Sequence, residues 1–229
     1  MTRYKTHEEI ELEYISVLGP DLGKVYHELE SEHVWLHDKW REYRTLFGDS
    51  VSRVDLLNRA AARFFGQLHD IWWEDVLLHI CRLTDPRKVG GHRQLTVRQL
   101  SDLIPEGTAR DRVESLVSAA CDASAFARDW RNRHIAHRSF ERATNPQARP
   151  LEHASRSSVE NAIGALDRVM NEVQLIYFDA GMSYDGGGGV GDAGDLLLIL
   201  NDGVRARNAR EERLRSGDPL PDDWAARTV

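Results

Sequence analysis

The chain has 229 residues, 41% of them hydrophobic and 29% charged, which is enough for a well-packed domain that folds without covalent staples. Its net charge of -7 argues against a general nucleic-acid coat. Only Cys81 and Cys121 are present, both in apolar helical patterns, which fits buried thiols in a reducing cytoplasm better than a disulfide or a metal site. The longest aliphatic run, Leu196 to Leu200, is too short to span a bilayer, and the first residues lack the apolar core of a signal peptide. We therefore expect a soluble cytoplasmic protein with no membrane contact.

Apolar residues recur at spacings of three and four along most of the chain, which predicts helices, whereas alternating strand patterns are nearly absent. Caps, glycines and prolines set the ends of these helices. The predicted helices cover about 6–18, 20–47, 52 to the Asp85-Pro86 break, a short segment from Thr96 to before Pro105, 108 to 137 or 138, 157–178 and 192–215. Residues 85–95 are expected to form a basic surface loop, and residues 140–155 an irregular segment.

Short connections between successive helices favour an all-α, up-and-down bundle. Gly186 to Gly189 form a flexible tether ahead of the last helix. The predicted organisation is thus a bundle over residues 1–184, followed by a Gly-rich linker, a C-terminal helix and a tail over residues 185–229.

Charge is unevenly distributed along the chain. Glutamates crowd its start, whereas arginines crowd the stretch from Arg128 to Arg149. The densest part reads Trp130-Arg-Asn-Arg-His-Ile-Ala-His-Arg138. Arginine binds phosphate through a planar fork, and histidine exchanges protons near neutral pH, so this segment suggests a local polyanion site with RNA-cleaving chemistry.

Helical geometry leaves two interpretations of this segment open. On an ideal helix Trp130, His134 and His137 lie within about 60° of one another, so they could simply end an apolar core face. However, Arg133 lies about 40° to one side of His137 and Arg131 about 100° to the other. The carboxylates close in sequence are Asp129 and Glu141 alone. Since Arg131 and His137 do not share a helical face, they can meet on one phosphate only through a break at the helix end or across a dimer axis, and we favour the dimer.

The string from Arg131 to His137 resembles the signature of HEPN domains, an arginine and a polar residue followed a few positions later by a histidine. The chain is similar to the abortive-infection branch of the AbiU type in three segments: Val76 to Asp85, Thr96 to Leu100, and the RNRHIAHR run. The resemblance covers roughly residues 20 to 180. It implies a helical bundle that dimerises, so that two such segments face one cleft and cut RNA without a metal.

The resemblance also implies roles for individual residues. His137 would assist the ribose 2′-hydroxyl or protonate the leaving oxygen, Arg131 would stabilise charge on the phosphate, and Asn132 would position the segment or the substrate. The RNA- and phosphate-binding candidates are Arg133, His134 and Arg138. The products would carry 2′,3′-cyclic phosphate and 5′-hydroxyl ends.

The expected function is therefore a metal-independent endoribonuclease of a bacterial phage-defence or toxin-like system, acting as a homodimer on RNA. An antitoxin or a nucleotidyltransferase is a possible partner. The alternative is a non-catalytic HEPN-type module that binds RNA or nucleotide or serves as a dimerisation adaptor. No cofactor is expected. No metal site is expected either, because His27, His33 and His37 share one helix without carboxylate or cysteine ligands close by in sequence.

Overall fold

The computed structural model of the protein describes residues 5–48, 50–137, 139–184, 186 and 189–225. These residues are overwhelmingly helical, which confirms the predicted all-α class. They cluster into two compact units, one of residues 1–40 and 73–186 and the other of residues 41–72 and 187–229. The predicted boundary near residue 184 stays a prediction.

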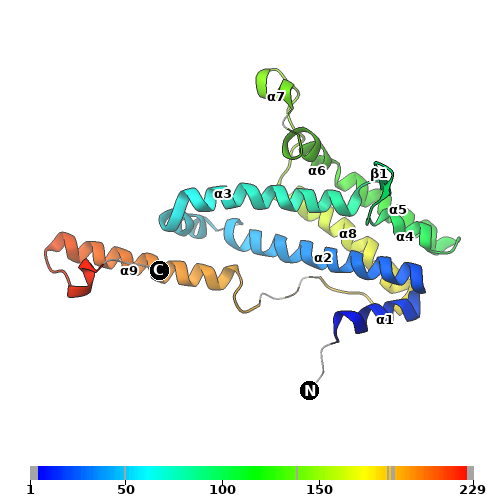
Figure 1. Cartoon of the computed structure of the whole chain (residues 1–229), viewed down its shortest axis with the longest axis horizontal. Helices are drawn as coiled ribbons and strands as arrows, with labels where there is room; N and C mark the ends of the chain where they lie inside the picture. Colours follow the sequence, from blue (N-terminus) through cyan, green and yellow to red (C-terminus); the bar gives the residue numbers. More distant parts are fainter. Residues whose placement is uncertain (1–4, 49, 138, 185, 187–188, 226–229) are drawn as a thin grey trace. The chain divides into compact units, whose positions relative to one another are not determined.

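The helices follow the predicted order closely (Figure 1). In chain order the elements are α1 (His7–Leu18), α2 (Pro20–Phe47), α3 (Val51–Thr84), β1 (Lys88–Val89), β2 (His92–Arg93), α4 (Arg98–Leu103), α5 (Thr108–Ala123), α6 (Ala125–Trp130), the π-helical turn η1 (Arg131–Ile135), α7 (Phe140–Thr144), α8 (Arg156–Phe178), α9 (Ala193–Ser216) and the 3-10 turn η2 (Pro221–Trp224). Helices α1, α2, α8 and α9 begin and end within one residue of their predicted limits. None of the helices in the described ranges is long and apolar enough to cross a membrane.

Local sequence signals determine where α1 begins and ends and how it packs on α2. Thr6 and Glu9 form a capping box at the start of α1, and Gly19 ends the helix with a positive φ of 82°. The backbone of Ile15 passes so close to Gly23 of α2 that a Cβ there would lie 2.7 Å from its Cα. Only glycine therefore allows α1 to fold back onto α2 at this point.

The core of the first unit lies between α2, α3, α5 and α8. The Tyr26 hydroxyl of α2 donates to the Met170 carbonyl of α8 at 3.2 Å, and the Cys121 thiol of α5 donates to the Thr84 carbonyl of α3 at 3.7 Å. Cys81 and Cys121 are both buried free thiols, as predicted, and burial raises the pKa of Cys81 to about 11. Fully buried aliphatic side chains fill this core, among them Leu29, Leu36, Leu77, Ile80, Leu100 and Leu166.

The second unit joins the end of α2, the first half of α3, and α9. Its core contains Leu46, Leu56, Leu57, Phe65, Ala193, Leu197 and Val204. The Glu42 carboxylate accepts a hydrogen bond from the Ala193 backbone at 2.7 Å, which ties the start of α9 to α2. Within α3 the predicted continuous helix is interrupted at Ala61, whose φ and ψ are -163° and 72°. The charged second half of α9 leads to η2, where Asp223 pairs with Arg213 at 2.6 Å.

The largest departure from the predicted elements is the helix expected from 108 to 137 or 138. It ends at Ser124, a buried residue whose hydroxyl donates to the Ala120 carbonyl at 2.7 Å. Serine hydroxyls that bond back to the preceding turn commonly bend helices. The chain then continues as α6 and η1, so the arginine and histidine segment lies on a separate, wider turn.

Two smaller departures concern segments that were expected to be irregular. The loop after Asp85 contains a short hairpin, in which β1 pairs with β2 across Gly90 and Gly91. Both glycines have positive φ, of 59° and 85°, which is the conformation that a two-residue hairpin turn requires. Residues 140–144 form the short helix α7, which Ser139 caps by accepting from the Arg142 backbone.

Burial of His79 in α3 predicts a pH-dependent stability. Desolvation, aided by Lys39 and Arg82, lowers the pKa of His79 from 6.5 to about 3. Between these pH values His79 is protonated in the unfolded chain and neutral in the folded chain. The free energy of unfolding therefore falls as the pH falls. We expect the free energy of unfolding of His79→Leu, measured in urea, to depend less steeply on pH than that of wild type. The difference should be about 1.4 kcal/mol per pH unit, which corresponds to one proton. The exposed His153 offers a control, and equal slopes in wild type and His79→Leu would contradict the prediction.

Candidate functional site

The arginine and histidine segment forms the π-helical turn η1, which directly follows the C-terminal end of α6. The Ala136 backbone N–H donates to the Arg131 carbonyl, five positions earlier, at 2.8 Å, and the Ser139 N–H donates to the Arg133 carbonyl at 3.3 Å. Such π-turns are rare and occur often at functional sites, because they re-aim side chains relative to a regular helix. The sequence left a helix-end break and a dimer axis as two ways to reconcile Arg131 with His137, and the structure contains the break.

Arg131 is held by a carboxylate from another helix. Its Nη1 lies 2.5 Å and 2.6 Å from the two oxygens of Asp85, which directly follows the end of α3. The Arg131 side chain is 25% exposed and that of Asp85 17%. The Nε of Arg131 donates to the Asn132 side-chain oxygen at 3.1 Å. Among the described residues no partner bonds to Nη2 of Arg131, and the side chain as a whole is 25% exposed.

Two carboxylates at this turn, one on α3 and one directly after it, were not expected from the sequence. Besides Asp85, Glu74 of α3 lies 3.6 Å from Nε2 of His134. Asp129 and Glu141 are the carboxylates close in sequence, and helix packing adds Asp85 and Glu74 from 46 and 60 positions away. The available signal was Asp85 itself, which ends one of the segments that resemble the family.

Arg133 ties the turn to the segment that follows α7. Its Nη1 lies 3.1 Å from both oxygens of Asp129 and 3.0 Å from the Pro150 carbonyl, and its Nη2 donates to the Arg149 carbonyl. The Glu152 backbone N–H also donates to Asp129, at 2.9 Å. Although burial opposes ionisation, these donors lower the pKa of Asp129. Because its guanidinium is engaged in these contacts, Arg133 is poorly placed to bind a phosphate through the same nitrogens.

The remaining predicted residues lie closer to solvent. Asn132 and His137 are exposed. His134 is half-buried, and its ring packs edge-on against Trp130 with centroids 5.6 Å apart. Arg138 falls outside the described residues. The core-face interpretation therefore fits Trp130 and His134 in part, but it does not fit His137.

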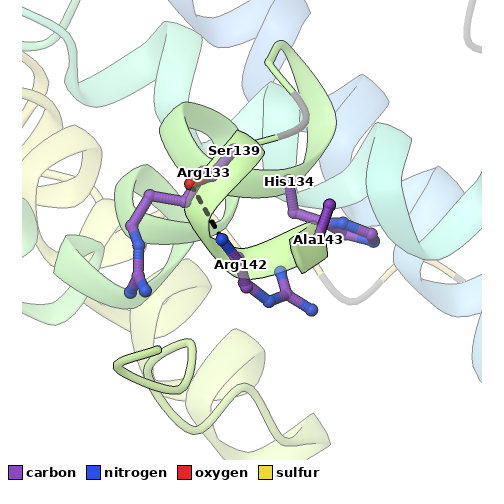
Figure 2. Close-up of a pocket in the computed structure, with 5 residues that line it drawn as sticks. All are labelled: Arg133, His134, Ser139, Arg142 and Ala143. Atoms are coloured by element: carbon purple, nitrogen blue, oxygen red, sulfur yellow. Dashed lines mark hydrogen bonds between the residues drawn. The ribbon is translucent and has the colours of Figure 1, made fainter. Parts of the chain in front are cut away.

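A small pocket opens between this turn and α7 (Figure 2). It has a volume of about 90 Å³ and is lined by Arg133, His134, Ser139, Arg142 and Ala143. In Figure 2 Arg142 extends from α7 between the side chains of Arg133 and His134. Arg142 belongs to the basic stretch of the sequence but was not predicted as a site residue. Two groups of metal-type donors occur in the described residues, and neither includes a residue of this turn.

The helical bundle, with an arginine, a polar residue and a histidine at the end of a helix, agrees with the resemblance to HEPN domains. The family model of the AbiU2 HEPN domain matches residues 19–196. The chain therefore belongs to the AbiU2 HEPN family, which confirms the resemblance drawn from the sequence and relates the protein to abortive infection. Comparisons with curated proteins and with solved structures find no match.

Proposed function

We propose that the protein is a metal-independent endoribonuclease that acts in abortive infection as a homodimer. The observation that carries this proposal is the setting of Arg131, whose guanidinium is fixed by Asp85 and Asn132 while Nη2 stays available at the turn that leads to the exposed His137. Fixed cationic donors stabilise charge that develops in a transition state better than mobile ones, because they need no reorganisation. Membership of the AbiU2 family supports the same assignment.

In the proposed reaction the ribose 2′-oxygen attacks the adjacent phosphorus and the bond from phosphorus to the 5′-oxygen breaks. One His137 takes the proton of the 2′-hydroxyl, and a second proton goes to the leaving 5′-oxygen. Two proton-transfer groups are needed at one time, and a second copy of the chain supplies the other histidine. Arg131 binds the non-bridging phosphate oxygens. The products are a 2′,3′-cyclic phosphate and a 5′-hydroxyl.

The pocket beside the turn suits a neighbouring phosphate of the RNA backbone. Arg142 and His134 present cationic or protonatable nitrogens to a space of about 90 Å³. Phosphate contacts of this kind position a nucleic acid without reading its sequence. His134 and Arg142 are therefore assigned to substrate binding, while the contacts of Arg133 favour a role in holding the turn.

The test is incubation of the purified full chain with total RNA in EDTA, followed by analysis of the fragment ends. We expect cleavage that needs no divalent ion and leaves cyclic phosphate and 5′-hydroxyl ends. Fragments with 5′-phosphate ends, or cleavage that depends on Mg²⁺, would contradict the proposed chemistry.

The ion pair of Arg131 with Asp85 also supports a second candidate, a non-catalytic HEPN module that binds RNA or a partner protein such as an antitoxin or nucleotidyltransferase. In that case the pair serves stability alone. A dimeric, folded protein that binds RNA in the same assay but leaves it intact would favour this candidate over the nuclease.

A further inference from the structure

Three side chains that the proposed nuclease does not use converge between α2 and α8. His33 and His37 lie one turn apart on α2, and Asp167 lies on α8. The Nε2 atoms of His33 and His37 are 2.6 Å and 2.7 Å from the same Oδ1 of Asp167. Two imidazole nitrogens and a carboxylate oxygen from separate helices therefore point at one place, and all lie within 4.8 Å of one another.

This group is enclosed on one side and open on the other. The side chain of His33 is 1% exposed and that of His37 is 10% exposed, whereas Asp167 is 30% exposed. The Tyr184 ring packs against both imidazoles, with centroid distances of 4.6 Å to His33 and 5.4 Å to His37. A small ion can therefore enter past Asp167 and find its nitrogen ligands already oriented by packing.

The donor types suit a metal ion. Imidazole nitrogens and a carboxylate oxygen are ligands that zinc takes in proteins. Each Nε2 now lies at hydrogen-bond distance from Oδ1, so metal binding must displace the protons of these hydrogen bonds.

We propose that His33, His37 and Asp167 form a binding site for a divalent transition-metal ion of the zinc class, which cross-links α2 to α8. Zinc bonds of about 2.0–2.1 Å in a tetrahedron place ligand atoms roughly 3.3 Å apart. The two nitrogens must therefore move away from Oδ1 by less than about 1 Å, which small side-chain rotations allow. Water takes the fourth position on the exposed side. The sequence argued against a metal site because no carboxylate lies close to these histidines along the chain. In the structure the packing of α8 against α2 supplies this carboxylate, Asp167.

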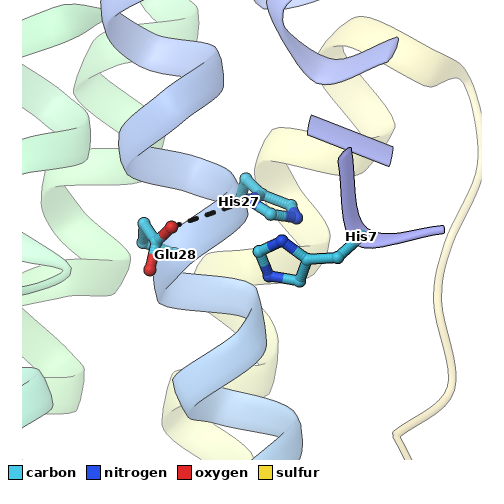
Figure 3. A group of neighbouring side chains, drawn as sticks. All are labelled: His7, His27 and Glu28. Atoms are coloured by element: carbon cyan, nitrogen blue, oxygen red, sulfur yellow. Dashed lines mark ion pairs between the residues drawn. The ribbon is translucent and has the colours of Figure 1, made fainter. Parts of the chain in front are cut away.

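A second donor group, formed by α1 and α2, is less suited to the same ion (Figure 3). It consists of His7, His27 and Glu28, and the closest approach of His27 to Glu28 is 3.9 Å. Figure 3 shows the two imidazoles together on one side of α2 and Glu28 turned away from them. This group provides the matched control, because it tests whether any two neighbouring histidines are sufficient.

The experiment is titration of the metal-stripped full chain with Co²⁺ and with Zn²⁺. The readouts are the visible Co²⁺ spectrum, the number of ions bound per chain and the thermal midpoint. The variants are His37→Gln and Asp167→Asn, with His7→Gln as the control and circular dichroism as the check of folding. We expect wild type and His7→Gln to bind Co²⁺ with an intense tetrahedral spectrum and to be stabilised by Zn²⁺. We expect His37→Gln to lose this spectrum and Asp167→Asn to bind at least about tenfold more weakly.

The opposite pattern overturns the proposal. If folded wild type binds no ion, or if binding is lost in His7→Gln and kept in both other variants, His33, His37 and Asp167 form a hydrogen-bonded clamp between the helices and no metal site. Because His37 and Asp167 are only partly buried, their variants are expected to fold, and His37→Gln retains a donor for Asp167.

Discussion

Replacement of His137 by alanine is expected to abolish RNA cleavage and to leave the protein folded. General acid and base catalysis by one positioned histidine contributes about 10²- to 10⁴-fold to a rate, so losing both copies in a dimer should bring cleavage to background. His137 is exposed, and exposed substitutions usually change the free energy of unfolding by no more than about 0.5 kcal/mol. The measurement is the initial rate of RNA cleavage in EDTA, together with the thermal midpoint of each protein.

His153 provides the matched control for this variant. It is also exposed, but it lies between α7 and α8, whereas His137 follows the π-helical turn by two positions. His153→Ala should cleave RNA at the wild-type rate. Equal activity of His137→Ala and wild type would remove His137 from the chemistry, and a large loss of stability in His137→Ala would return it to a structural role.

Most of the helical framework could be predicted because its limits are local. Thr6 caps α1, Gly19 ends it, and Pro20 starts α2, and these signals act over one turn of chain. The burial of Cys81 and Cys121 also followed from apolar periodicity alone. Such features depend on neighbours three or four positions away, which the sequence displays directly.

The details of the candidate site could not be predicted in the same way. The break at Ser124 depends on a hydrogen bond from its side chain to the backbone of the preceding turn, and the π-turn at Arg131 depends on backbone hydrogen bonds that span five residues. A regular 100° periodicity cannot represent either event. The angular argument that separated Arg131 from His137 was therefore made for a helix that the protein does not form.

Contacts between residues far apart in sequence are the second reason why parts of the candidate sites were not predicted. Asp85 meets Arg131 across 46 positions, and Asp167 meets His33 across 134. In both cases the sequence showed one charge or ligand type without its partner. Helix packing supplies the carboxylate in each case. Asp85 fixes the guanidinium of Arg131, and Asp167 joins His33 and His37 in a group of three donors.

Substitution of Asp85 by asparagine is expected to reduce cleavage about 100-fold, because Arg131 loses the contact that fixes its guanidinium. Displacing a catalytic group by about 1 Å is enough for a loss of this size. Since both side chains are mostly buried, the variant should also lose about 1–3 kcal/mol of unfolding free energy through the lost charged hydrogen bonds. The measurements are kcat and KM on a defined RNA and urea unfolding. A lower kcat with little change in KM would show that Asp85 acts by positioning Arg131.

Arg131→Lys separates positioning from charge. Lysine keeps the cation but lacks the planar fork that contacts Asp85 and Asn132 together and still leaves Nη2 for phosphate. It should therefore cleave at least as poorly as Asp85→Asn, while Asp122→Asn, which changes an exposed carboxylate of α5, should retain full activity. If Asp85→Asn cleaves at the wild-type rate and Arg131→Lys does not, Arg131 works without its anchor. If Asp85→Asn loses stability and wild type never cleaves, the ion pair belongs to an adaptor, in which this arginine stabilises the end of a helix rather than a transition state.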